Sequence, residues 1–162
     1  MRVTAEGSDE GRWSLDGVPG ADIVRIDVAG TLVFLVSAAA AVASDGFLRD
    51  LFVGVSLVLF GVGTVVMAAG LLRAIGRSRY EAISVADLFL LTGAPRPIRW
   101  WLQSCVAVQT VASFVAAGIR PFTGVAFGIL VPVFGLAASG WWSARHGTFG
   151  ERGGPGAEAR PG

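Results

Sequence analysis

Residues 51–72 read LFVGVSLVLFGVGTVVMAAGLL, a run of 22 residues with no acidic or basic side chain. A bilayer core about 30 Å thick is spanned by roughly 20 apolar residues, because an α-helix rises about 1.5 Å per residue. The run is apolar on every side, whereas a helix on the surface of a soluble protein keeps one polar face. It therefore predicts a transmembrane helix.

Three other stretches have the same character. Residues 100–119 and 122–142 are long enough to span the membrane without an acidic or basic residue, and residues 23–43 reach that length with Arg25 and Asp27 near their start. Hydrophobic residues make up 53% of the 162 positions, more than a soluble domain usually holds. The sequence thus predicts an all-α bundle of four transmembrane helices over residues 23–146. A polar, flexible segment (1–22) precedes it, and a disordered, glycine-rich tail (147–162) follows it.

The arginines predict the orientation of these helices. All 13 basic residues are arginine, and eleven of them lie in residues 1–25, in the loop 73–99 and in residues 145–162. The two remaining connections hold only Arg49 and Arg120. Because basic residues near membrane spans concentrate on the cytoplasmic side, both termini are predicted to be cytoplasmic. Two tryptophan pairs, at 100–101 and 141–142, fall at the same predicted interface, which indole rings prefer.

An alternative to four spans is that the first apolar run is a signal peptide cleaved after Ala43. Ala41, Val42 and Ala43 follow an apolar run and precede Ser44, as at a signal-peptidase site. The preceding segment is long and acidic, unlike the short basic region of a signal peptide, which favours an uncleaved first helix. A mature chain starting at Ser44 would contradict the four-helix prediction, and its intact mass would show it.

Small residues predict where the helices meet. Lipid provides no hydrophobic drive between helices, so close contacts depend on small side chains that let two backbones approach. Residues 51–72 carry small residues on two opposite sides, which predicts a helix between two neighbours. Pro132 predicts a bend and leaves the Gly128 carbonyl without its usual donor. The glycines predicted to mediate helix packing are Gly54, Gly61, Gly63, Gly124, Gly128 and Gly135.

The third predicted span has a polar side. Cys105, Gln109 and Ser113 recur at a four-residue spacing that places them on one face of a helix. Two interpretations stay open: hydrogen bonds to neighbouring helices, or a polar path for a transported substrate. The next connection is only Arg120 and Pro121. It predicts a tight hairpin, with Pro121 in the first turn of the fourth helix and Arg120 extended to the headgroups.

Asp27 is the one carboxylate beside a span that shares the small-residue side of its helix. Because it is near the predicted cytoplasmic end of residues 23–43, it is expected to form a structural salt bridge with Arg73, Arg99 or Arg145. The alternative is a coupling carboxylate that binds a proton or cation during transport. The two hypotheses differ in whether Asp27→Asn removes ion flux without loss of folding.

The loop 73–99 is longer than a connection between two helices requires. Ser84 and Asp87 resemble a capping box, with Asp in place of Glu or Gln, and predict a short interfacial helix over residues 84–92. Val85, Leu88 and Phe89 share one face of this helix. The face is predicted to anchor the loop on the bilayer, where nearby arginines attract anionic headgroups, or to dock another protein.

No residue cluster in the sequence suggests catalysis. There is no nucleophile–base pair, metal-ligand spacing or phosphate-binding loop, so no enzyme activity, catalytic residue, cofactor or metal is predicted. A net charge of +1 gives no general attraction for nucleic acid. The small-residue faces and the long loop favour a non-enzymatic accessory or scaffolding subunit of a membrane assembly, with a membrane protein or a second copy as partner. The alternative is a small oligomeric transporter or exporter.

The second half of the chain resembles part of a known family. The segments RPFT (120–123), AFG (126–128) and ARHGTF (144–149) are similar to the closing hairpin of small uncharacterised actinobacterial four-helix integral membrane proteins. The absence of lysine fits such a source. The resemblance implies four transmembrane helices in a bacterial plasma membrane, and it brings no activity, cofactor or catalytic residue with it.

Overall fold

The computed structural model describes residues 17–78 and 84–149, and these residues are helical apart from short connections. Four helices are long and apolar enough to cross a membrane, as predicted, and the fourth consists of a 3-10 helix followed by an α-helix. The predicted segment 1–22 and tail 147–162 lie mostly outside the described residues. In chain order the elements are α1 (Ala21–Ala43), α2 (Phe47–Arg77), α3 (Val85–Leu90), α4 (Arg96–Ile119), η2 (Gly124–Leu130) and α5 (Pro132–His146).

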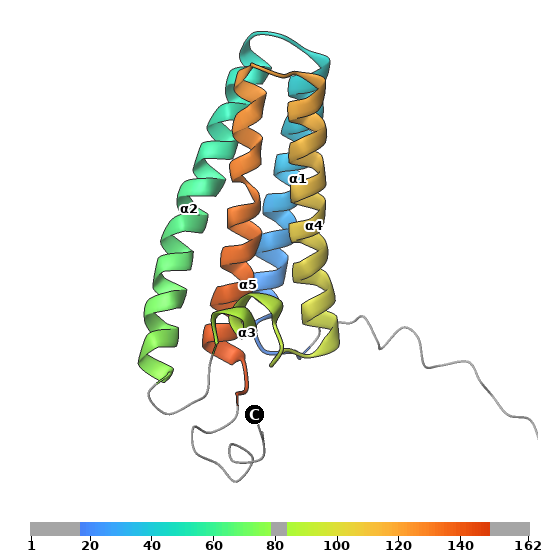
Figure 1. The fold of residues 1–162 in the computed structure, drawn as a ribbon. Coiled ribbons are helices and arrows are strands. Elements are labelled where there is room, and N and C mark those ends of the chain that lie inside the picture. The colour runs from blue at the N-terminus through green and yellow to red at the C-terminus, as the bar shows by residue number, and fades with distance from the viewer. Residues whose placement is uncertain (1–16, 79–83, 150–162) are drawn as a thin grey trace, which may run out of the picture.

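The helices form an up-and-down bundle. α1 and α4 run in one direction, and α2 and α5 run in the other (Figure 1). The connections from α1 to α2 and from α4 to η2 lie together at one end, and α3 lies at the opposite end (Figure 1). We call the end with α3 the arginine-rich end, because Arg73, Arg77, Arg96, Arg99 and Arg145 all lie on its helical turns.

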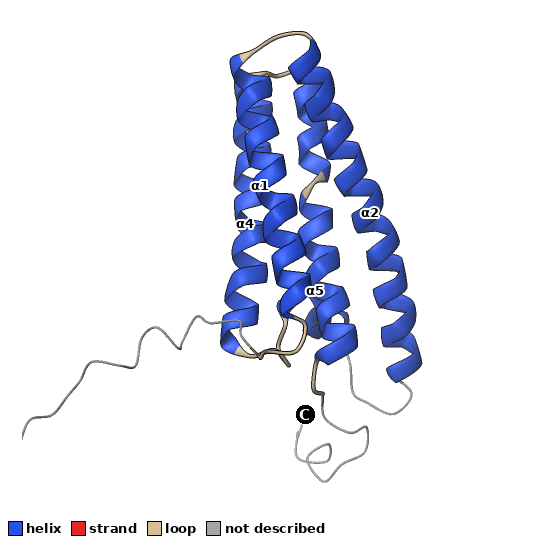
Figure 2. Cartoon of the chain, turned by 180° about the vertical axis from the view of Figure 1, so that it is seen from behind, coloured by secondary structure: helices blue, strands red, loops and turns tan. Residues whose placement is uncertain are grey.

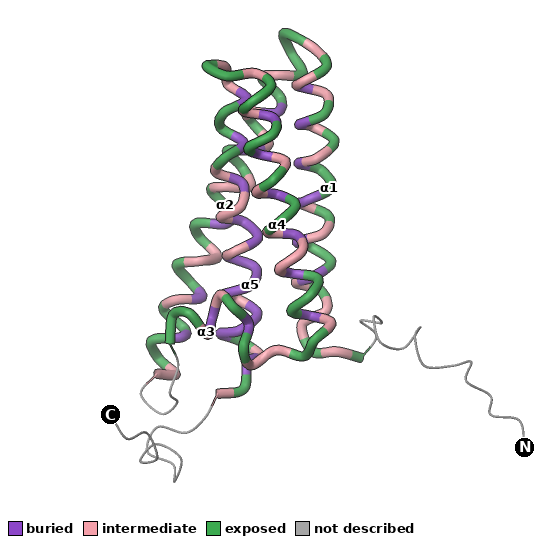
Figure 3. The backbone as a smooth tube through the Cα atoms, turned by 45° about the vertical axis from the view of Figure 1, so that its right-hand side comes forward, coloured by how far each residue is buried: buried purple, intermediate pink, exposed green. Residues whose placement is uncertain are grey.

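The fourth span forms the centre of the bundle. Half of it is buried, against 28% or less of each of the other three spans, and α5 contacts α1, α2, α3 and α4. Figure 3 shows buried positions following α5. Val36, Val65 and Leu72 on the outer sides of α1 and α2 are 71%, 69% and 71% exposed, as expected where hydrocarbon surrounds the helices.

The helix ends extend beyond the charge-free runs. α2 begins at Phe47 and ends at Arg77 instead of covering residues 51–72, and α4 begins at Arg96 instead of Trp100. A spanning helix continues through the polar headgroup region, where charged side chains are tolerated. The absence of charge therefore marks only the hydrocarbon part of each helix, and the predicted boundaries are too narrow.

The fourth span, in contrast, begins later than predicted. η2 starts at Gly124 with Thr123 as its N-cap, so Pro121 lies in the connection and not in the first helical turn. In the same connection Phe122 adopts a positive φ of 59° and is fully exposed. The hairpin is tight, as expected, but its turn takes four residues instead of two.

Arg120 ties this hairpin to the neighbouring connection. It was expected to extend to the headgroups, but it donates from Nη1 to Asp45 Oδ1 (2.8 Å) and from Nη2 to the Val42 carbonyl (3.0 Å). Arg49 pairs with the same carboxylate. The prediction missed this contact because Asp45 lies beyond the end of α1, and only the fold brings it beside the end of α4.

Pro132 breaks the fourth span, as its position predicts. Proline has no N–H to donate to the Gly128 carbonyl, the acceptor four residues earlier. That carbonyl accepts the Val131 N–H (3.0 Å) and the Ser113 hydroxyl of α4 (2.8 Å) instead. The break between η2 and α5, visible in Figure 2, is thus stabilised by a polar side chain of a neighbouring helix.

The two predicted tryptophan pairs differ in their surroundings. Trp100 and Trp101 are 61% and 40% exposed at the arginine-rich end, consistent with an interfacial position. Trp142 is only 2% exposed, and its indole N–H donates to the Pro19 carbonyl (3.1 Å). Trp142 is therefore enclosed by its own bundle at this end and is not exposed as Trp100 and Trp101 are. The interfacial depth of the four indoles stays a prediction.

Candidate functional site

Asp27 lies inside the bundle, about 9 Å along α1 from its first residue, and its side chain is fully buried. The Gln109 amide of α4 donates from Nε2 to Asp27 Oδ1 (3.3 Å) and to Thr31 Oγ1 (2.7 Å). The second carboxylate oxygen, Oδ2, has no hydrogen-bond partner. The described side chains around Asp27 therefore offer it only neutral donors, in surroundings where an unpaired charge is costly.

Helical spacing brings four polar side chains together at this point. Asp27 and Thr31 are four residues apart on α1, as Cys105 and Gln109 are on α4, so each pair shares one face of its helix. The Cys105 thiol is close enough to interact with both Asp27 and Thr31. Since α1 and α4 run in the same direction, the two faces stay matched over a full turn. We call Asp27, Thr31, Cys105 and Gln109 the polar cluster.

α5 closes over the polar cluster through small residues. A Cβ atom added to Gly135 would lie 2.8 Å from Gln109 Oε1, and one added to Gly30 would lie 2.6 Å from the Phe134 ring. Gln109 Oε1, like Asp27 Oδ2, has no donor. The polar cluster therefore contains two buried oxygen acceptors without donors, an arrangement that a bound proton or cation would satisfy.

Apolar residues enclose the polar cluster along the length of the bundle. Toward the short connections lies a buried group around Phe34 and Phe52, whose ring centroids are 5.7 Å apart. Toward the arginine-rich end lies a second group that includes Val24, Leu102 and Trp142. Any route from the polar cluster to either surface therefore requires these side chains to move.

The predicted salt bridge of Asp27 is wrong. Among residues 17–78 and 84–149, no arginine forms an ion pair with Asp27. The three candidate partners lie on outer turns of their helices: Arg73, Arg99 and Arg145. Asp27 lies near the end of the second turn of α1, at the level of Gln109, which is about 15 Å along α4 from Arg99. Although Asp27 is close in sequence to the end of the span, it lies inside the bundle and not at its end.

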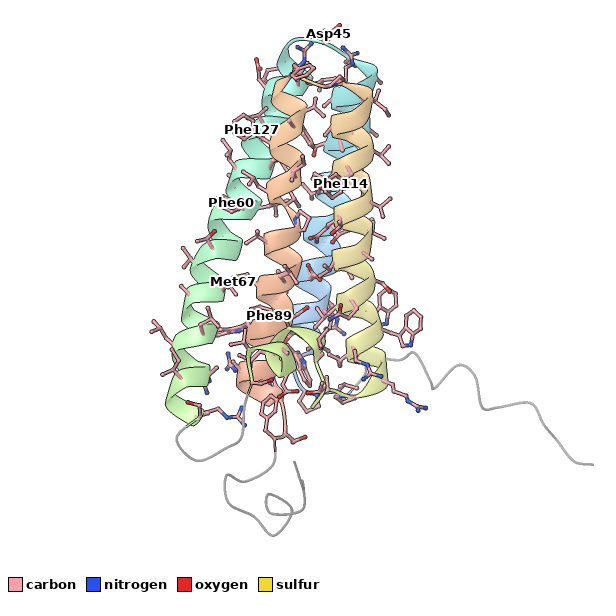
Figure 4. All side chains as sticks on the ribbon, viewed as in Figure 1. Asp45, Phe60, Met67, Phe89, Phe114 and Phe127 are labelled. Carbon is pink, nitrogen blue, oxygen red and sulfur yellow. The ribbon has the colours of Figure 1, made fainter. Side chains whose placement is uncertain are left out.

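The face of α3 that was expected to dock a partner is mostly turned into the bundle. Leu88 is 3% exposed and packs against α2 and α5. The Phe89 ring lies 3.0 Å from the position of a Cβ added to Gly140, and Figure 4 shows it where α3 meets α5. Of the three residues Val85 is exposed (63%), Phe89 is partly buried and Leu88 is buried. The face therefore holds α3 on its own bundle.

Two polar contacts at the arginine-rich end have no local signal in the sequence. Gln103 Nε2 of α4 donates to the Phe89 carbonyl of α3 (2.7 Å). Arg77 of α2 donates to the carbonyls of Ala144 and Gly147 (3.0 Å each). A cation at the C-terminus of α5 satisfies carbonyls that have no N–H partner in the helix. Arg77 reaches these carbonyls only because α2 packs parallel to α5, which places the C-terminal ends of both helices side by side.

The predicted capping box is present at the start of α3. The Asp87 N–H donates to Ser84 Oγ (3.1 Å), and Asp87 Oδ2 accepts the Ser84 N–H (3.2 Å) and hydroxyl (2.7 Å). Thr92 Oγ1 donates to Asp87 Oδ1 (2.9 Å). These hydrogen bonds hold the pKa of Asp87 below its usual value, and the bond to the Ser84 side chain has a larger effect than the bond to Thr92.

We expect acid to loosen α3. A carboxyl whose pKa is lowered by folding stabilises the folded state above its unfolded pKa, and this contribution is lost as the pH falls through the lowered value. Amide hydrogen exchange of residues 85–91, corrected for the intrinsic rate, should therefore accelerate below about pH 4. Ser84→Ala should already show fast exchange of the same residues at neutral pH. Equal protection in variant and wild type would contradict a capping role.

The glycines predicted to mediate packing fall into two groups. Four of them would bring an added Cβ within 2.9 Å of an atom of a neighbouring helix: Gly63, Gly124, Gly128 and Gly135. Gly54 and Gly61 have nothing within 4 Å of that position. α2 therefore packs against its own bundle through one of its two small-residue sides, and the expected second neighbour is not part of this chain's described residues.

No protein-family model, curated protein or solved structure matches this chain. In the part of the chain that the structure describes, no group of three or more His, Cys, Asp or Glu side chains could hold a metal ion. The buried Cys105 is a free thiol. The polar cluster and the outward side of α2 are thus the two features from which a function can be inferred.

Proposed function

We propose that this chain is a non-enzymatic membrane protein that works as a subunit of a larger membrane assembly and binds its partner through the open side of α2. We define the open side as Gly54, Val58, Gly61, Val65 and Ala68, all of which are exposed or partly exposed. The single observation that carries the proposal is that a Cβ added to Gly54 or Gly61 would meet no atom of a neighbouring helix within 4 Å. A stripe of small residues facing lipid leaves a shallow groove that a second helix fits.

The opposite side of α2 shows what such a stripe does in this protein. Ser56, Gly63 and Gly70 recur every seven residues, as Gly54, Gly61 and Ala68 do on the open side, and they are buried. At Gly63 and Gly70 the backbone of α5 lies directly against α2. One small-residue side of the helix thus supports a close backbone contact, and the other has the same spacing without a partner.

Crosslinking in native membranes tests the proposal. In a Cys105→Ser background, Ala68→Cys should react with a short bis-maleimide and join the chain to a neighbour. Val62→Cys is the control, because Val62 is exposed on the same helix about 120° away. A product that also contains a different membrane protein supports an accessory subunit, and a product of two copies supports a homo-oligomer. No product from Ala68→Cys, or equal yield from Val62→Cys, would contradict the proposal.

A second candidate function is a small oligomeric transporter in which Asp27 is the coupling carboxylate. The depth of Asp27 favours it: a buried carboxylate inside a span, without a cationic partner among the described residues, often marks an ion or proton pathway. The unpartnered oxygens of Asp27 and Gln109 provide a place for the transported or coupled ion. The enclosed polar cluster would then belong to a closed state.

Flux into liposomes separates the two candidates. A transporter should release an imposed pH gradient, and Asp27→Asn should abolish that release while the protein stays folded. Ser139→Ala is a matched control, since Ser139 is another fully buried polar residue and its hydroxyl only returns to the Gly135 carbonyl of its own helix (3.1 Å). If the wild-type protein shows no flux and crosslinks to a different protein, the transporter role is excluded and the subunit role is supported.

We also propose that the arginine-rich end faces the cytoplasm of a bacterial cell and that both termini lie on that side. The support is the contrast between this end and the opposite one, where Arg49 and Arg120 are both bound to Asp45. A periplasmic reporter enzyme inserted after Asp45 should be active, and the same reporter fused after residue 162 should be inactive. The reverse pattern would overturn the orientation.

A further inference from the structure

A groove opens between α3 and α4 at the arginine-rich end. It has a volume of about 530 Å³ and is lined by Leu90, Arg99, Trp100, Gln103, Ser104 and Ala107. Leu90 belongs to α3, and the other five residues follow one side of α4. None of them belongs to the polar cluster or to the open side of α2, so the groove is independent of the proposed function.

The lining changes from charged to apolar along the groove. Arg99 ends the first turn of α4 and Trp100 begins the second. Ser104 lies about one turn deeper, and Ala107 lies about 12 Å from Arg99 along the helix. Trp100 is 61% exposed, and indole rings prefer the depth of the membrane interface. The outer end of the groove therefore lies at headgroup depth, and the inner end lies in the hydrocarbon.

The positive charge of Arg99 is not paired with an acidic side chain of the described residues. At the same end Arg77 is held by carbonyls of α5, whereas no ion pair joins Arg99 to any residue within 17–78 or 84–149. The adjacent Gln103 is fixed by the Phe89 carbonyl (2.7 Å), which holds α3 and α4 together as the two walls. An exposed guanidinium beside a fixed wall is suited to bind a phosphate group.

We propose that this groove binds one anionic phospholipid of the surrounding bilayer, with its phosphate at Arg99 and an acyl chain along Ala107. Basic pockets between helices at the cytoplasmic side of membrane proteins bind such headgroups. The positive charge of Arg99 selects an anionic headgroup over a zwitterionic one, and Ser104 adds a hydroxyl near ester depth. Leu90 and Ala107 supply apolar surface for the chain.

Lipid retention by the purified full-length protein tests the headgroup assignment. The delipidated protein is titrated with phosphatidylglycerol or with phosphatidylcholine of the same acyl chains, and bound lipid is counted by native mass spectrometry. Wild type should retain phosphatidylglycerol more tightly. Arg99→Gln should weaken its retention about fivefold and change phosphatidylcholine little. Arg96→Gln, the same loss of charge at the start of the same helix but outside the groove, should change neither.

A second pair of variants tests the acyl-chain assignment. Ala107→Phe fills the inner end of the groove and should weaken retention of both lipids, whereas Val108→Phe, at the next exposed position, should not. Equal losses from Arg99→Gln and Arg96→Gln would show a diffuse attraction. Displacement of bound phosphatidylglycerol by excess glycerol phosphate would show a site for free phosphate. Either result, or an Ala107→Phe variant that binds like wild type, would overturn the proposal.

Discussion

Replacing Gly63 with leucine should prevent the bundle from forming, because Gly63 lies where α2 crosses α5 backbone to backbone. A Cβ at this position would be 2.8 Å from the Phe134 Cα and 2.9 Å from its nitrogen. These atoms belong to a central helix and cannot move aside as a flexible side chain does. Overpacking a rigid contact costs about 3 kcal/mol, and more where backbones must separate. The measurement is the yield of monodisperse protein in detergent and its thermal midpoint.

Gly61→Leu is the matched control on the same helix. Gly61 faces outward, and a Cβ added there would meet nothing within 4 Å. Leucine at this position should therefore change the free energy of unfolding of the isolated chain by no more than about 0.5 kcal/mol, as surface substitutions do. The same variant should reduce crosslinking through Ala68→Cys, since it fills the open side of α2. If Gly63→Leu is as stable as Gly61→Leu, the packing of α2 on α5 described above is wrong.

This contrast also shows what the sequence can and cannot predict about a membrane bundle. The four spans follow from length and absence of charge, because a lipid-facing helix must be apolar over the thickness of the bilayer. The two small-residue sides of α2 are equally visible in the sequence. Which side meets the rest of the chain is not, because an apolar residue satisfies lipid and protein equally well. Only the observed contacts distinguish Gly63 from Gly61.

The short helix α3 illustrates the same limit. Its capping box depends on local hydrogen bonds between Ser84 and Asp87, so the start of the helix was predictable. Its buried side was not, because Leu91 adopts a positive φ of 56° at the end of the helix and turns into the core. A helical wheel assumes regular geometry and places Leu91 about 60° from Leu88, on the side of Asp87 and away from Phe89. In the structure both are buried.

The sequence predicted the part of the polar cluster that lies on α4, but not the part that lies on α1. The four-residue spacing of Cys105, Gln109 and Ser113 indicates a polar face on α4, and the structure confirms hydrogen bonds from that face to neighbouring helices. The partnership of Gln109 with Asp27 was missed, because α1 and α4 are separated by about half the chain. A residue's depth follows from where its helix begins, and α1 begins before the apolar run does.

Replacing Gln109 with leucine should destabilise the bundle by roughly 3 kcal/mol, since it removes the one side-chain amide that donates to Asp27 Oδ1 and Thr31 Oγ1. The Asp27 carboxyl would then be buried with neither oxygen accepting a side-chain amide. Asp27→Asn, which keeps the shape of the side chain and removes its charge, should cost far less. The thermal midpoints of the two variants in one detergent measure this difference.

The double variant Asp27→Leu with Gln109→Leu decides what the polar cluster is for. Replacing both partners of a buried polar pair by apolar residues of similar shape is often nearly neutral, so the double variant should recover most of the stability that Gln109→Leu loses. If it does and the crosslink through α2 persists, the cluster serves only to set the register of α1 against α4. If the double variant is stable but loses a pH-driven flux that Gln109→Leu retains in part, Asp27 acts on a proton or cation. A double variant less stable than Gln109→Leu alone would show that Asp27 makes a favourable contact independent of Gln109.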